Sequence, residues 1–146
     1  MATRTARVSL DTANKWVATV QVGPHGLVSD VPPDKEGNDL GPTPEELLLS
    51  AWGSCTAMTV GMYAKHKQWP LKNVFVTLEW HKGGVGKLDQ FVRRVRFEGE
   101  LDEAQRARLV EIAERCPVHK AFTGQKEVVT REEEKEDVHA SVHSQE

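Results

Sequence analysis

The chain contains two cysteines, Cys55 and Cys116, and their thiols are its strongest candidate nucleophiles. A thiolate can attack the O–O bond of a peroxide, become a sulfenic acid, and then be captured by a second thiol as a disulfide. Such a cycle needs two thiols and a cation or hydrogen-bond donor that stabilises the thiolate and the departing alkoxide. The sequence therefore allows a redox couple of Cys55 and Cys116.

Each cysteine also has a simpler interpretation. Cys55 lies on an apolar helical stripe, where a free cysteine usually behaves as a small buried hydrophobe. Cys116 is followed by Pro117 and, three residues on, by His119. A proline favours the first position of a helix, so Cys116 is expected at the N-cap of a short helix over 117–122, where helix-terminal N–H groups favour a thiolate.

A zinc site is the main rival for these side chains. Its ligands would be Cys55, Cys116 and His119, with His25 or His66 as a fourth. Zinc sites usually show ligands paired two to four residues apart, and only Cys116 and His119 have that spacing. The spacing therefore favours no metal site.

The longest helical pattern, over 43–66, carries Cys55. Thr43 is a predicted N-cap, Pro44 suits the first helical position, and Glu46 completes a capping box. An apolar stripe at three and four spacing predicts a buried central helix; its members are Leu48, Ala51, Cys55, Met58 and Met62. On another side Gly53, Ala57 and Gly61 would let a helix or a second subunit approach closely. Glu45 stands ten residues before Cys55 and could orient a cation. It could equally be an ordinary acid of the first helical turn, where the helix dipole favours a negative charge.

The remaining patterns predict an α+β domain over 1–130. A hairpin is expected over 5–10 and 15–22, with a third short strand over 27–30. Alternating residues predict antiparallel strands over 73–81 and 90–98, which are followed by a helix over 103–115 and a last strand over 125–130. The charged segment 131–146 is expected to be a solvated tail.

Composition excludes several classes of function. The net charge of -3 and the absence of a basic cluster argue against nucleic-acid binding. No apolar run approaches the length of a membrane span, and the N-terminus lacks the apolar core of a secretory signal. We therefore expect a cytoplasmic protein that does not enter the membrane.

Two motifs resemble the OsmC/Ohr family of thiol-dependent hydroperoxide reductases, and specifically its OsmC-like redox-protein branch: GPTPEELLLSAWGSCTAMTVGMYAKHKQWPL and, some sixty residues later, RCPVHKAF. The resemblance implies an intertwined α+β homodimer, in which antiparallel sheets wrap two long central helices and active sites lie at the subunit interface. It implies Cys55 as the peroxidatic thiol, Cys116 as the resolving thiol and Glu45 as the acid that positions an arginine. It also implies an organic hydroperoxide substrate, a dithiol reductant such as the dihydrolipoyl groups of the Ohr branch, and no cofactor.

The sequence departs from the family pattern at the catalytic arginine. No arginine lies between Arg7 and Arg93, and His25 in GPHGLV stands where the Ohr branch has its arginine. Histidine can donate a hydrogen bond but lacks the guanidinium fork. Four later arginines could supply the charge from the same or a partner chain: Arg93, Arg94, Arg96 and Arg115. The alternative function is a non-catalytic dimer that binds a small molecule or senses redox state.

Overall fold

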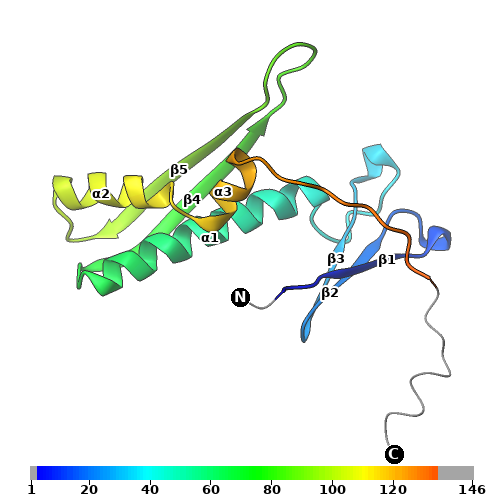
Figure 1. The fold of residues 1–146 in the computed structure, drawn as a ribbon, viewed down its shortest axis with the longest axis horizontal. Helices are drawn as coiled ribbons and strands as arrows, with labels where there is room; N and C mark the ends of the chain where they lie inside the picture. Colours follow the sequence, from blue (N-terminus) through cyan, green and yellow to red (C-terminus); the bar gives the residue numbers. More distant parts are fainter. Residues whose placement is uncertain (1–2, 135–146) are drawn as a thin grey trace, which may run out of the picture.

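The computed structural model describes residues 3–134 and is organised along one long helix, α1, Pro44–His66 (Figure 1). A three-stranded sheet precedes it, with β1 at Arg7–Leu10, β2 at Ala18–Val22 and β3 at His25–Ser29. A hairpin and two helices follow it: β4 Leu71–His81, β5 Gln90–Gly99, α2 Glu103–Ala113 and α3 Pro117–Thr123. Short 3-10 turns occupy Thr12–Asn14 and Pro33–Lys35. The predicted α+β class is confirmed.

Helix α1 begins and ends where its local sequence requires. The Thr43 hydroxyl accepts the Glu46 N–H at 3.1 Å, and the Glu46 carboxylate accepts the Thr43 N–H at 3.1 Å, which confirms the predicted capping box. At the other end Gln68 adopts a left-handed φ of 58°, and the Trp69 N–H donates to the Ala64 carbonyl at 2.9 Å. These caps fix the length of the helix that carries Cys55.

The predicted direction of the apolar stripe on α1 is wrong. The buried face carries Trp52, Gly53, Thr56, Val60 and Ala64. The predicted stripe faces outward instead, with Met58 61% and Met62 70% exposed and Cys55 half-buried. Periodicity identifies which residues share a face, but α1 has two apolar faces, and the face that carries Trp52 and Val60 meets the core of its own chain.

Small residues on α1 serve the packing of β4. A Cβ added at Gly53 would lie 2.5 Å from the Leu78 Cδ2, so this glycine lets the strand approach the helix. The sequence suggested a second helix or subunit here, whereas the neighbour of Gly53 is a strand of the same chain. A Cβ added at Gly61 would meet no heavy atom within 4 Å in the described chain.

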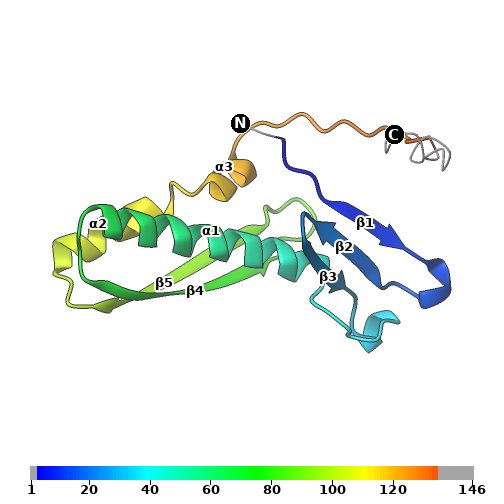
Figure 2. The ribbon, with the colours of Figure 1, turned by 90° about the horizontal axis from the view of Figure 1, so that it is seen from below.

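The hairpin of β4 and β5 is antiparallel, as predicted, with Val74 opposite Phe97 and Leu78 opposite Arg93. Figure 2 shows α1 and α2 on the same side of this sheet. The buried apolar core lies between these elements and consists of Val60, Ala64, Phe97, Leu109, Ile112 and Ala113. Helix α2 has the predicted Asp102 cap but ends at Ala113, because Glu114 forms its C-cap.

The N-terminal sheet has the strand order β1-β2-β3 and lies beyond the N-terminal end of α1 in both ribbon views (Figures 1 and 2). The predicted hairpin and third strand are both present, although the third strand begins at His25 rather than Leu27. Several of its large apolar side chains are open to solvent in one chain; Val8 is 62% and Leu10 45% exposed. This sheet therefore has little hydrophobic core of its own.

The C-terminal prediction is partly wrong. Residues 125–130 form no strand, because no neighbouring strand pairs with them in the described chain. Of the predicted tail over 131–146, residues 135–146 lie outside the described part. Within residues 3–134, no helix is long and apolar enough to cross a membrane.

Candidate functional site

Cys116 is fully buried at the start of α3, at the N-cap predicted for it. Its Sγ accepts the backbone N–H of His119 at 3.3 Å. The same sulfur lies 3.8 Å from the Thr56 Oγ1, on the buried face of α1. The cysteine is therefore held between α3 and the central helix.

Hydrogen-bond donors and acceptors around Thr56 determine which way the thiol hydrogen points. The single hydroxyl hydrogen of Thr56 is donated to the Trp52 carbonyl at 2.8 Å. The Cys116 S–H is consequently the donor in its contact with Thr56. This buried contact therefore directs the Cys116 thiol toward the helical turn that carries Cys55.

Arg93 completes this cluster from β5. Its Nη1 donates to the Thr56 Oγ1 at 3.2 Å, and its Nη2 lies 3.3 Å from the His119 Nδ1. Because a guanidinium only donates, the Nδ1 must accept and the neutral imidazole carries its proton on Nε2. Of the four arginines named from the sequence, Arg93 is the one whose guanidinium binds the Thr56 hydroxyl that Cys116 contacts.

The guanidinium of Arg93 lies over the Trp52 ring, 5.0 Å from its centroid. Among residues 3–134, no carboxylate lies within ion-pair distance of Arg93. Strand alternation could have found this residue, because Phe91, Val95 and Phe97 predict an inward face that includes position 93. The roles of Thr56 and Trp52 in this cluster were not predicted from the sequence.

Cys55 immediately precedes Thr56, so Cys116 packs against the helical turn that carries Cys55. The Cys55 side chain itself lies half-buried at the outward apolar stripe. No hydrogen bond from a described side chain reaches its sulfur. The structure therefore places the two cysteines on adjoining elements, but within residues 3–134 it gives the Cys55 thiol no side-chain hydrogen-bond partner.

Glu45 pairs with a lysine rather than an arginine. The Lys82 Nζ lies 2.7 Å from the Glu45 Oε1, and both side chains are more than half exposed. The same ammonium lies over the Trp80 ring at 4.1 Å. Ten helical residues separate Glu45 from Cys55, which is about 15 Å along the axis, so this pair does not reach the Cys55 thiol of its own chain.

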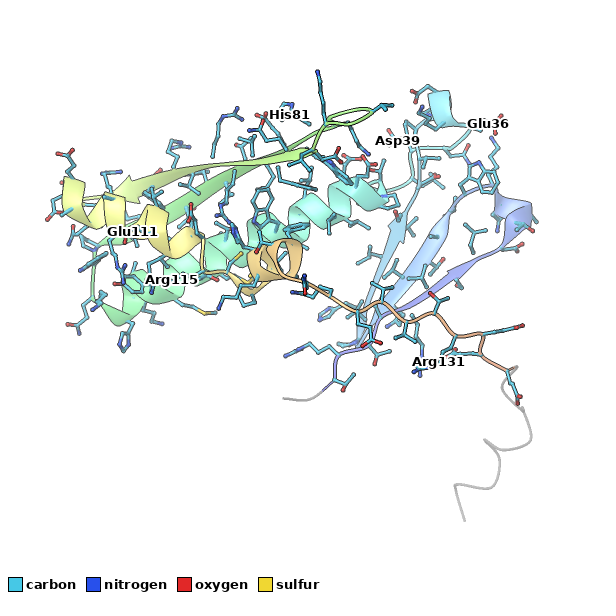
Figure 3. All side chains as sticks on the ribbon, turned by 45° about the horizontal axis from the view of Figure 1, so that its top comes forward. Glu36, Asp39, His81, Glu111, Arg115 and Arg131 are labelled. Atoms are coloured by element: carbon cyan, nitrogen blue, oxygen red, sulfur yellow. The ribbon has the colours of Figure 1, made fainter. Side chains whose placement is uncertain are left out.

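His25 lies in the other sheet. It opens β3, pairs with Val22 and is exposed. The structure does not bring it to Cys55 within one chain. The other arginines named from the sequence are also elsewhere: Arg94 pairs with Glu79, Arg96 lies over the Phe75 ring at 3.9 Å, and exposed Arg115 follows α2 (Figure 3).

A pocket of about 240 Å³ adjoins the Arg93 cluster between α1, β5, α2 and α3. It is lined by Trp52, Phe91, Arg93, Val95, Val110, Ala113, Glu114 and His119. Trp52 is only 4% exposed, and its Nε1–H has no hydrogen-bond partner within residues 3–134. In the part of the chain that the structure describes, no three acids, cysteines or histidines are grouped to hold a metal ion.

Comparisons with known proteins agree on one fold. A family model described as OsmC-like protein matches residues 36–131. None of the curated protein sequences matches this chain significantly. An OsmC-like protein from Mycoplasma pneumoniae is 15% identical with a TM-score of 0.71, over 84% of this chain and 89% of that chain. At these identities structural similarity establishes the fold alone.

Two further structures with this fold are described as organic hydroperoxide resistance proteins. The one from Legionella pneumophila is 20% identical with a TM-score of 0.64, covering 85% of this chain and 91% of that chain. The one from Elizabethkingia anophelis, with bound thiocyanate, is 17% identical with a TM-score of 0.64, covering 85% and 90%.

Proposed function

The chain belongs to the OsmC-like protein family, and on that premise we propose that it is a thiol-dependent peroxidase that reduces organic hydroperoxides through Cys55 and Cys116. The observation that carries this proposal is the contact of Cys116 with Thr56, the residue next to Cys55 on α1. A disulfide requires Cα atoms within about 7 Å, and packing on the same helical turn favours such proximity. The descriptions of the Legionella and Elizabethkingia relatives point to the same substrate class.

In the first step the Cys55 thiolate attacks the distal oxygen of the hydroperoxide. An S–O bond forms and the O–O bond breaks, so the sulfur is oxidised to a sulfenic acid and the peroxide is reduced to an alcohol after its alkoxide takes a proton. Cys55 suits this role because its half-buried position is open to a substrate, whereas Cys116 is fully buried.

In the second step Cys116 attacks the sulfenic sulfur of Cys55. The S–S bond forms, the S–O bond breaks and water leaves. Cys116 suits the resolving role because its contact with Thr56 holds its sulfur beside the helical turn that carries Cys55. A dithiol then reduces the disulfide by thiol exchange, which restores both thiols and oxidises the reductant.

The Cys55 site is completed, in this proposal, by a second copy of the chain. The outward stripe of α1 exposes Met58 and Met62, and the N-terminal sheet exposes Val8 and Leu10. Contiguous exposed apolar surfaces of this kind mark interaction sites. In a homodimer the partner's Glu45–Lys82 pair or its N-terminal sheet with His25 would supply the missing donor at Cys55.

The test is consumption of cumene hydroperoxide with dihydrolipoamide as reductant, in wild type and in Cys55→Ser and Cys116→Ser variants. We expect Cys55→Ser to abolish turnover, because no other thiol is open to the substrate. Cys116→Ser should consume one equivalent and then stall as a sulfenic acid. Equal rates in all three proteins would contradict the proposed function.

A further inference from the structure

A residue of the pocket beside Arg93 carries a buried hydrogen-bond donor that no atom of residues 3–134 accepts. The Trp52 indole lies 4% exposed in its wall, and the Nε1–H lacks a partner. Buried polar groups normally have a partner, because leaving one unpaired costs free energy. An acceptor atom from outside the chain would satisfy this N–H.

The same pocket contains a cation, Arg93, that has no carboxylate within ion-pair distance among residues 3–134. Arg93 is half-buried, and in the described part of the chain its hydrogen-bond partners are two neutral groups, the Thr56 hydroxyl and the His119 imidazole. These two bonds use two of the five guanidinium N–H groups, so others stay available. A partly desolvated guanidinium is stabilised most by an anion with paired oxygens.

Part of the remaining wall consists of hydrocarbon side chains. Phe91, Val95, Val110 and Ala113 contribute hydrocarbon surface, and the volume of about 240 Å³ admits only a small molecule. We propose that this pocket binds a small organic carboxylate, with its carboxylate on the Arg93 guanidinium and Trp52 N–H and its hydrocarbon part against Phe91 and Val95. The proposal requires no peroxide turnover and stands independently of the proposed function.

Glu114 gives the proposal a second, opposite test. It lines the pocket from the C-cap of α2, and its side chain is exposed. Its negative charge opposes a bound carboxylate, so Glu114→Gln should strengthen binding of an anion and leave binding of a neutral ligand unchanged. A purely structural role of Arg93 would not produce this effect.

The experiment titrates sodium benzoate into the reduced, ¹⁵N-labelled full chain at low ionic strength and follows the indole N–H signals. The chain has four tryptophans, and Trp52→Phe identifies the signal of Trp52. Benzyl alcohol controls for the charge, and sodium sulfate controls for the hydrocarbon part. Each variant is checked for its native fold by circular dichroism.

We expect benzoate to shift the Trp52 signal, and to bind at least about tenfold more tightly than benzyl alcohol or sulfate. Arg93→Met should weaken binding at least about tenfold, Trp52→Phe about fivefold, and Glu114→Gln should tighten it about threefold. An unmoved Trp52 signal, or equal binding of sulfate, would overturn the proposal. If Arg93→Met does not fold, benzoate affinity that Glu114→Gln leaves unchanged or weakens overturns it equally.

Discussion

Thr56 Oγ1 lies 3.8 Å from Cys116 Sγ, a side-chain contact between residues 60 positions apart in the sequence. The same oxygen accepts a hydrogen bond from Arg93 and donates one to the Trp52 carbonyl. One buried hydroxyl therefore connects α1, β5 and the start of α3. Its position explains why Cys116 is held beside the turn that carries Cys55.

Replacing Thr56 with valine should show how strongly this hydroxyl couples the elements. Thr56→Val keeps the shape but leaves the Arg93 Nη1 without its acceptor, which costs about 1–3 kcal/mol of unfolding free energy. In an Arg93→Met background the loss should be smaller by at least about 0.5 kcal/mol, because the donor is gone. Urea denaturation at fixed protein concentration measures both, and additive losses would contradict the coupling.

Gly53→Ala should destabilise the packing of α1 on β4. The new Cβ would lie 2.5 Å from the Leu78 Cδ2, so the strand side chain must move. Overpacking costs about 1–3 kcal/mol of unfolding free energy, whereas replacing glycine with alanine in a helix gains about 1 kcal/mol. The cost exceeds the gain at the upper end of its range and roughly cancels it at the lower end. We therefore expect Gly53→Ala to lower the free energy of unfolding in the wild-type chain. In a Leu78→Ala background, which lacks the clashing atom, the same change should raise it. Equal effects of Gly53→Ala in both backgrounds would show that this contact does not limit packing.

Asp30 should make the stability of the loop before α1 depend on pH. Burial raises the pKa of its carboxyl, but hydrogen bonds from three backbone N–H groups outweigh burial and lower the pKa below its ordinary value. The donors are Val31 at 2.7 Å, Leu40 at 3.1 Å and Asn38 at 3.2 Å.

The stabilisation by Asp30 is present above the unfolded-state pKa of about 4 and is lost as pH falls through the lower folded-state pKa. Asp30→Asn should therefore lower the Tm at pH 7 more than at pH 2. The exposed Asp34 provides the control, since Asp34→Asn should change the Tm little at either pH. A pH-independent effect of Asp30→Asn would refute this account.

Tyr63 is the only tyrosine of the chain, so its ionisation can be followed alone. The Arg108 Nε donates to its phenolic oxygen at 3.1 Å. This hydrogen bond and the positive charge of Arg108 lower the pKa of Tyr63 below its usual value of about 10. Phenolate absorbance should titrate below that of a model tyrosine. Arg108→Met should raise the pKa again, and an unchanged titration would show that the contact does not form in solution.

Local signals predicted most of the fold. Thr43, Pro44 and Glu46 defined the start of α1, and alternation defined β4 and β5 with their inner faces. The strand expected over 125–130 was wrong because a β-rich segment becomes a strand only when a neighbour pairs with it. The outward stripe of α1 was misassigned because sequence periodicity does not distinguish a core face from a face left for another chain.

The candidate site was predictable only in part. The position of Cys116 at a helix N-cap followed from Pro117, which is a local effect. The grouping of Arg93, Thr56 and Trp52 depends on tertiary packing between β5 and α1, and no short-range pattern contains it. Glu45 and His25 remain predictions for the site, because a single chain places neither beside Cys55.

The most direct test of the Cys55–Cys116 couple is the intact mass of the protein after one equivalent of cumene hydroperoxide under non-reducing conditions. The account predicts a rapid mass loss of two hydrogen atoms in wild type, and addition of one oxygen atom in Cys116→Ser. Cys55→Ser should keep its mass. An unchanged wild-type mass, or the same loss in Cys55→Ser, would contradict a disulfide formed between Cys55 and Cys116.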